Sequence, residues 1–279
     1  MNCFQLVKTV LDELYARIPG ESDAAKDKLI NHHLNALSDA YAQLLRRNTV
    51  DHANVVTRFA YIYRYVTAHA NYVYQMLLKS EPLQALFTLE RIHITCVGGG
   101  PGSDFLGVLK YVQHAGKTPS LKCILYDREN AWGESWLDVD DKLDETDLRI
   151  NTTFQQFDVT QQSSWENSTK YLMSDLFSMV YFLSEVYSVK AEAEPFFINM
   201  FYNAKPGALF LFIDNNSPAF YEWFDEMVAC SPVDVLDRFH GRMVISDYSE
   251  QKHDLGEYRE KFENPKLQAD VAYRVCRRR

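Results

Sequence analysis

The sequence predicts an α/β fold in which helices cover both faces of a mostly parallel β-sheet, preceded by a region of helices alone. Two observations support this. Up to about residue 88, apolar residues recur every three or four positions, which is the period of helices that bury one face. After Arg91, short apolar runs alternate with helical stretches, which is the pattern of consecutive β-α-β units. We therefore divide the chain into residues 1–88 and 89–279.

The first region is expected to hold three helices. Apolar positions at helical spacing fill residues 4–18 and stop at a Pro-Gly pair, and the same spacing returns over 29–45. A third helix is expected over 51–79, before Pro82. Its apolar residues occupy more than one face, which indicates a largely buried helix.

The second region is expected to supply five parallel strands, whose continuous apolar character is typical of burial on both faces. These strands are predicted at residues 92–97, 121–126, 150–157, 176–183 and 208–213. Helices are predicted between them at residues 103–114, 131–142, 165–173, 190–203 and 218–229. The tail is expected to add one strand at 233–239 or 242–245 and another at 271–276.

Composition and charge limit the possible partners and compartment. The net charge of −9 disfavours a dedicated nucleic-acid binder, which usually has a basic domain, although a local basic patch stays possible. Five cysteines without paired spacing predict neither a zinc site nor a disulfide framework and favour a reducing compartment. No leader pattern and no apolar run of membrane-spanning length is found, so we expect a cytoplasmic or nuclear protein.

A glycine-rich turn follows the first predicted strand. Residues 98–102 read Gly-Gly-Gly-Pro-Gly and lead directly into a helix. Glycines permit positive φ and let a ligand approach the backbone, and the free N–H groups at a helix start attract negative charge. At the first turn of a β-α-β array, this pattern predicts a nucleotide-type ligand.

The spacing of the glycines separates the possible ligands. Gly98, Gly100 and Gly102 are spaced GxGxG, whereas dinucleotide folds use GxGxxG, so an NAD-dependent oxidoreductase is disfavoured. A phosphate-binding loop ending in GK[ST] is absent. The turn instead resembles motif I of class I S-adenosylmethionine (SAM)-dependent methyltransferases. The resemblance implies a seven-stranded, mostly parallel sheet in residues 89–279 and SAM as the cofactor, with Gly98, Gly99, Gly100 and Gly102 beneath its methionine part.

One position departs from that family. Members usually carry an acidic residue two positions before the first glycine, where this chain has Cys96. We therefore take Asp104, just after the turn, as a candidate substitute.

Acidic residues at the next strand ends extend the resemblance. Asp127 ends the second predicted strand about 25 residues after the loop, where a carboxylate accepts hydrogen bonds from both ribose hydroxyls. Arg128 follows it and joins the candidate cofactor residues. After the third strand, Phe157 and Asp158 match the positions that contact adenine in the family. A solvated turn is the alternative for both acids.

The fourth predicted strand leads to Ser184, Glu185 and Tyr187, where the family places residues beside the transferred methyl group. The segment is not the [DN]PP[FY] motif of amino-methylating members. We take Ser184 as a cofactor contact and Glu185 and Tyr187 as candidate catalytic residues. Glu185 would act as a general base if the pocket raises its pKa. An ordinary exposed loop glutamate is the alternative.

The third helix carries a row of polar and aromatic residues. Tyr61, Arg64, Tyr65 and His69 fall on one face at spacings of three and four. A similar helix precedes the SAM domain in some ribosome-associated methyltransferases, so residues 1–88 are expected to cap the SAM site and form part of a substrate wall, with Tyr65 near the cofactor. An ordinary core helix is the alternative.

The resulting hypothesis is a SAM-dependent methyltransferase without a metal site. Its acceptor is unidentified: a small molecule, a protein or ribosomal RNA. The alternative is a catalytically inactive SAM-binding sensor or scaffold, which the missing acid at Cys96 and the unusual residues after the fourth strand favour.

Overall fold

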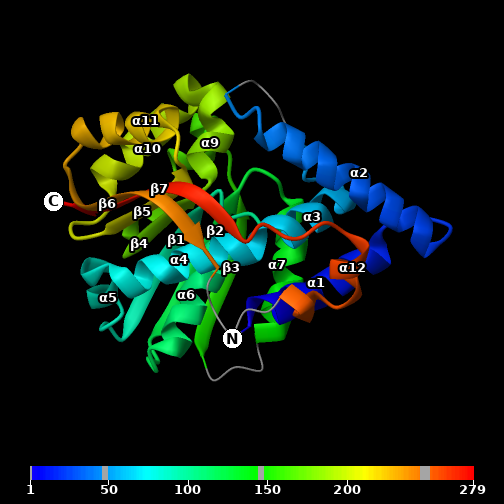
Figure 1. Cartoon of the computed structure of the whole chain (residues 1–279). Helices are drawn as coiled ribbons and strands as arrows, with labels where there is room; N and C mark the ends of the chain where they lie inside the picture. The colour runs from blue at the N-terminus through cyan, green and yellow to red at the C-terminus, as the bar shows by residue number, and fades with distance from the viewer. Residues whose placement is uncertain (1, 46–49, 144–147, 246–251) are drawn as a thin grey trace.

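The fold is built on one seven-stranded sheet with the strand order β3-β2-β1-β4-β5-β7-β6 (Figure 1). The computed structural model describes residues 2–45, 50–143, 148–245 and 252–279. The strands are β1 (Arg91–Val97), β2 (Ser120–Asp127), β3 (Arg149–Gln156), β4 (Leu176–Val180), β5 (Leu209–Asn215), β6 (Val233–Val244) and β7 (Gln268–Arg278). Strands β1 to β5 are parallel, and β7 is antiparallel to both of its neighbours. This confirms the predicted α/β sheet and gives it the strand order of the class I methyltransferase fold.

Helices surround this sheet. They are α1 (Cys3–Arg17), α2 (Asp23–Tyr41), α3 (Val55–Tyr61), α4 (Thr67–Lys79), α5 (Glu81–Leu86), α6 (Ser103–His114), α7 (Ala131–Leu143), α8 (Gln162–Trp165), α9 (Phe182–Val186), α10 (Lys190–Asn203), α11 (Pro218–Ala229) and α12 (Glu257–Lys261). Within the described residues, none of them combines the length and apolarity needed to cross a membrane.

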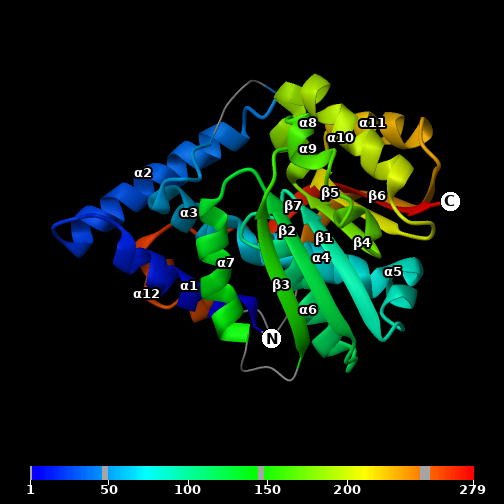
Figure 2. The ribbon, with the colours of Figure 1, turned by 180° about the vertical axis from the view of Figure 1, so that it is seen from behind.

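Two separate cores lie on the two faces of the sheet. One contains the buried side chains of α1 to α7, and the other those of α8, α10 and α11. Alternate residues of each strand point to opposite cores, as the pleat requires: Leu211 belongs to the first and Phe210 to the second. Figures 1 and 2 show the amino-terminal helices on the same side as α6 and α7. They therefore complete the cover of one sheet face.

Strand β4 is shorter than the sequence predicts. It ends at Val180 because Tyr181 adopts a left-handed conformation, with φ 56° and ψ 26°. The Tyr181 N–H donates to the carbonyl oxygen of Ile213 in β5 at 2.7 Å, which holds this turn at the carboxyl ends of β4 and β5. The chain then enters α9, so Ser184 and Glu185 lie on a short helix.

The third amino-terminal helix is interrupted. It begins at Val55, later than the predicted Asp51, because the Asn54 side chain caps it by accepting the Val56 N–H at 2.8 Å. A π-helical turn at Ile62–Val66 separates α3 from α4. Such wider turns are often found at functional sites.

Two other predicted segments also differ. The helix expected over 165–173 is replaced by α8 and a short 3-10 turn at Tyr171–Met173. Strand β6 spans both alternatives predicted for the tail, with an irregularity between Val235 and Asp237. That irregularity shifts the alternation that the sequence analysis used to delimit the strand.

Helices α4 and α6 approach closely at Gly107, which gives a test of this packing. A Cβ added at Gly107 would meet the Ala70 carbonyl oxygen and lie 2.7 Å from Val73 Cβ. We expect Gly107→Ala to lower the free energy of unfolding by at least about 1 kcal/mol, because overpacking outweighs the better helix propensity of alanine. Urea denaturation measures this. Gly20→Ala, whose nearest neighbour is the flexible Lys26 side chain, is the control, and an equal effect of both variants would contradict the prediction.

Candidate functional site

A cavity of about 420 Å³ lies at the carboxyl ends of the central strands. Its walls come from the glycine turn, the segments after β2 and β3, helix α9 and the amino-terminal region. Ligands of open α/β sheets bind outside the carboxyl ends of the strands, at the point where the strand order reverses. Here that point lies between β1 and β4.

Different local contacts explain why each of these positions in the turn is a glycine. A Cβ on Gly98 would overlap the Phe182 ring, one on Gly102 would overlap Trp136, and one on Gly99 would lie 2.9 Å from Cys96 Cβ. At Gly100, which has φ 39°, the nearest atoms would be 3.6 Å away in Trp132. Gly98 and Gly100 line the cavity, whereas Gly99 and Gly102 do not. Packing accounts for Gly98, Gly99 and Gly102, whereas at Gly100 an added Cβ would make only ordinary contacts, so its positive φ is the reason for glycine there.

Asp127 joins the end of β2 to this turn. Its Oδ2 accepts the Gly100 N–H at 3.0 Å, and its Oδ1 accepts the Glu129 N–H at 2.9 Å. Burial raises the pKa of Asp127 to about 6, and these two hydrogen bonds oppose the rise. The carboxylate lines the cavity, so the structure brings Asp127 and Gly100 together at one wall.

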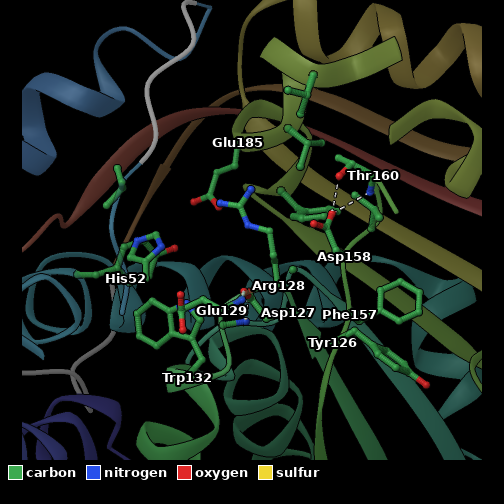
Figure 3. Close-up of a pocket in the computed structure, with 18 of the residues that line it drawn as sticks. His52, Tyr126, Asp127, Arg128, Glu129, Trp132, Phe157, Asp158, Thr160 and Glu185 are labelled. Carbon is green, nitrogen blue, oxygen red and sulfur yellow. Dashed lines mark hydrogen bonds between the residues drawn. The ribbon is translucent and has the colours of Figure 1, made fainter. Parts of the chain in front are cut away.

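The segment after β3 forms the adjacent wall. Phe157 packs against Tyr126 with ring centroids 4.6 Å apart. Asp158 Oδ1 accepts hydrogen bonds from the Thr160 N–H at 2.9 Å and from Thr160 Oγ1 at 2.7 Å, as Figure 3 shows. Both predicted residues line the cavity, and part of the hydrogen-bonding capacity of Asp158 serves its own turn.

Arg128 and Glu185 approach each other from different sides of the cavity. In Figure 3 the Arg128 side chain extends toward Glu185. Tyr41 at the end of α2 donates to Glu185 Oε1 at 2.9 Å. The Glu185 side chain is accessible from the cavity, yet the enclosing protein, followed by repulsion from Asp127, raises its pKa to about 8.

Asp104 lies outside this cavity. It is buried behind the turn, where its Oδ2 accepts Ser178 Oγ at 2.6 Å and its Oδ1 accepts Ser103 Oγ at 3.3 Å. Burial raises its pKa to about 7. Cys96 is also buried, with its Sγ 3.7 Å from Cys123 Sγ. Asp104 thus holds α6 to β4. It does not reach the cavity, where it was expected to substitute for the acid missing at Cys96.

Unlike Glu185, the neighbouring residues Ser184 and Tyr187 do not line this cavity. The Ser184 N–H donates to the buried Asp214 Oδ2 at 2.9 Å. Tyr187 packs against the Phe220 and Trp223 rings, with centroids 5.3 and 5.9 Å away. It lines neither this cavity nor the smaller chamber described below. The helical turn of α9 therefore points the Glu185 and Tyr187 side chains in different directions.

A smaller chamber of about 90 Å³ adjoins the cavity. Tyr41, Tyr61 and Glu185 line both spaces. The remaining walls of the chamber are Tyr65, His69, Tyr181, Ser184, Asn215 and Lys266. Of the aromatic row predicted in the third helix, Tyr61, Tyr65 and His69 reach the chamber. Arg64 instead pairs with Glu263 at 3.1 Å.

Tyr41 and His52 are among the cavity residues that sequence reasoning missed. Tyr41 ends α2, and His52 packs against Trp132 and Tyr61 with ring centroids 5.1 and 5.3 Å away. Burial lowers the pKa of His52 to about 4. No motif marks either position, because both reach the site only through the packing of the amino-terminal helices onto the sheet.

Comparisons with known proteins give only distant likenesses. No family model and no curated protein matches the chain. A SAM-dependent methyltransferase from Methanosarcina mazei is similar at 9% identity over 71% of this chain and 98% of its own, with a TM-score of 0.45. A precorrin-6y C5,15-methyltransferase from Geobacter metallireducens is similar at 9% identity over 72% and 89%, with a TM-score of 0.39. The strand order, rather than these likenesses, gives the chain the class I methyltransferase fold.

The buried Asp104 makes stability depend on pH. Its folded pKa of about 7 exceeds the ordinary value of 3.8, so the folded chain keeps a proton that the unfolded chain releases. Its stabilising contribution is therefore present below about pH 4 and lost as pH rises through about 7. We expect Asp104→Asn to gain stability relative to wild type by about 2–4 kcal/mol between pH 4 and 8, measured by urea denaturation. Asp234→Asn, at an exposed position, should show no such trend, and a pH-independent effect of Asp104→Asn would contradict the prediction.

Proposed function

We propose that this protein is a SAM-dependent methyltransferase. One observation carries the proposal: Gly100 of the glycine turn and the carboxylate of Asp127 are joined by a hydrogen bond at the wall of one cavity. That cavity lies where a class I methyltransferase sheet reverses its strand order.

The residues of the cavity fit SAM. Asp127 keeps its carboxylate at the cavity wall, where it would accept hydrogen bonds from the ribose hydroxyls. Phe157 and Asp158 would contact the adenine ring and its amino group. Gly98 and Gly100 line the cavity, where they would lie beside the methionine part. Arg128 would face the same ligand, and Tyr65 would approach it from the smaller chamber.

The cofactor, when bound, supplies a methyl group activated by its positively charged sulfur. The main task of the chain is then to hold an acceptor in line and to exclude water. Tyr41 and Tyr61 stand between the two spaces and would provide part of this enclosure. Glu185, also shared by both, is the group proposed to take a proton from the acceptor.

A SAM-binding sensor is the second candidate. Two observations favour it. The Phe182 ring packs against Gly98 of the candidate cofactor turn, and the candidate catalytic residue Tyr187 packs away from the cavity. Transfer of a labelled methyl group from SAM to components of a cell lysate separates the two. Labelled product that disappears in Asp127→Ala supports the enzyme, whereas SAM binding without any labelled product supports the sensor.

Cofactor binding is tested by calorimetry with S-adenosylhomocysteine. We expect Asp127→Ala to weaken its affinity at least tenfold, because the variant loses the proposed ribose acceptor and the anchor of the Gly100 N–H. Asp127→Asn should weaken it less, since one acceptor oxygen stays. Asp234→Ala removes an exposed carboxylate as the control. No binding to the wild-type protein would eliminate the proposal.

The role of Glu185 predicts a pH profile. A carboxylate must be deprotonated to accept a proton, so single-turnover methyl transfer should rise with pH up to about 8. Glu185→Gln should lower the rate and flatten the profile while leaving S-adenosylhomocysteine affinity within about threefold. The same rise in the variant would assign the profile to another group.

A further inference from the structure

The smaller chamber is walled by aromatic rings from distant parts of the chain. Tyr61, Tyr65 and His69 follow one another at four-residue intervals, with successive ring centroids 5.2 and 5.7 Å apart. The His69 ring also stacks on Tyr181, 4.2 Å away and 11° from parallel. Tyr41 meets the edge of Tyr65 at 5.3 Å. Aromatic walls of this kind favour a flat ligand, which gains dispersion and edge-to-face contacts.

Two residues that line this chamber carry buried polar atoms that have no hydrogen-bond partner among the described residues. His69 is 3% exposed, and among the described residues neither of its ring nitrogens has a hydrogen-bond partner. The hydroxyl of Tyr181, a residue 6% exposed, has no partner there either. Buried polar groups are nearly always hydrogen-bonded, so two such groups lining one cavity indicate a ligand with a polar edge.

The stacking of two tyrosine rings on His69 determines which part of its ring can meet that ligand. Tyr65 and Tyr181 are both stacked with the imidazole ring, at interplanar angles of 26° and 11°. The ring edge, which carries the two nitrogens, is then the part that offers hydrogen bonds. Burial holds the pKa of His69 well below its usual value, so the neutral ring has one donor and one acceptor nitrogen.

The charges around the chamber disfavour ionic ligands. The Lys266 ammonium lies over the Tyr65 and Tyr181 rings, 5.7 and 5.0 Å from their centroids, and would repel a cation. Among the described lining residues it is the single lysine or arginine, whereas phosphate sites usually combine several donors. Glu185, which also lines the chamber, would carry the opposite charge once ionised, so the two side chains together favour neither a cation nor an anion. An uncharged group is the remaining fit.

We propose that this chamber receives the methyl acceptor, and that the acceptor presents a flat, uncharged aromatic ring with an N–H or O–H on its edge. The proposal rests on the proposed methyltransferase function, since it uses the chamber that adjoins the cofactor cavity. His69 would accept the hydrogen bond of that edge, and Tyr181 would provide a second polar contact. His69 and Tyr181 thus become specificity residues for an aromatic acceptor.

Four small probes of similar size test the chemistry of the chamber: phenol, benzene, the benzylammonium ion and phenyl phosphate. Their affinities are measured by ligand-observed NMR on the full chain saturated with S-adenosylhomocysteine. We expect phenol to bind at least fivefold more tightly than each of the other three. Benzylammonium or phenyl phosphate binding as tightly as phenol, or no phenol binding at all, would overturn the proposal.

Variants assign the binding to the chamber. His69→Phe keeps a stacked ring but removes both nitrogens, so the preference for phenol over benzene should fall to less than twofold. Tyr181→Phe removes only the hydroxyl and should lower the preference by a smaller factor. His32→Phe, at an exposed position of α2, is the matched control and should keep it. A full preference in both His69→Phe and Tyr181→Phe would place phenol elsewhere and refute the assignment.

Failure of this proposal is distinguishable from failure of the proposed function. S-adenosylhomocysteine binding is measured separately by calorimetry, and near-ultraviolet circular dichroism reports the folding of each variant. If S-adenosylhomocysteine binds and phenol shows no preference, the acceptor chemistry is wrong and the function stands. If S-adenosylhomocysteine does not bind the wild-type protein, the proposed function itself fails.

Discussion

The carboxylate of Asp127 accepts N–H groups from Gly100 on one side and from Glu129 on the other. These two hydrogen bonds hold the glycine turn, the end of β2 and the start of the following loop in one arrangement. In this arrangement Gly98 and Gly100 line the cavity, while Gly99 and Gly102 pack closely against Cys96 and Trp136. Loss of this carboxylate would therefore change the shape of the cavity as well as its chemistry.

A second constraint is the packing of the amino-terminal helices onto the sheet. The π-helical turn at Ile62–Val66 lies within the aromatic row that runs from Tyr61 to His69, and His69 stacks on Tyr181 at the end of β4. This contact joins the helical region to the left-handed residue that turns the chain into α9. The cavity and the aromatic chamber consequently share walls from both regions.

Buried acids concentrate at the same end of the sheet. Burial raises the pKa of Asp104, Asp127 and Asp214, and enclosure raises that of Glu185. Their tasks differ: Asp104 and Asp214 bind hydroxyl or N–H donors inside the fold, whereas Asp127 and Glu185 line the cavity. Proximity of acids to a site therefore does not assign them to its chemistry; what separates them is whether the side chain lines the cavity.

The sequence predicted the sheet, the glycine turn and the position of Asp127, because strand period and glycine spacing are local and parallel strands end at one edge. It did not determine which residues after β4 face the cavity. The left-handed Tyr181 begins α9 early, so Glu185 reaches the cavity and Tyr187 packs on Trp223. Helical spacing predicted that Tyr61, Tyr65 and His69 share one face. The rest of the aromatic chamber depends on tertiary packing, because residues as far apart as Tyr41 and Lys266 meet there through contacts that no local pattern encodes.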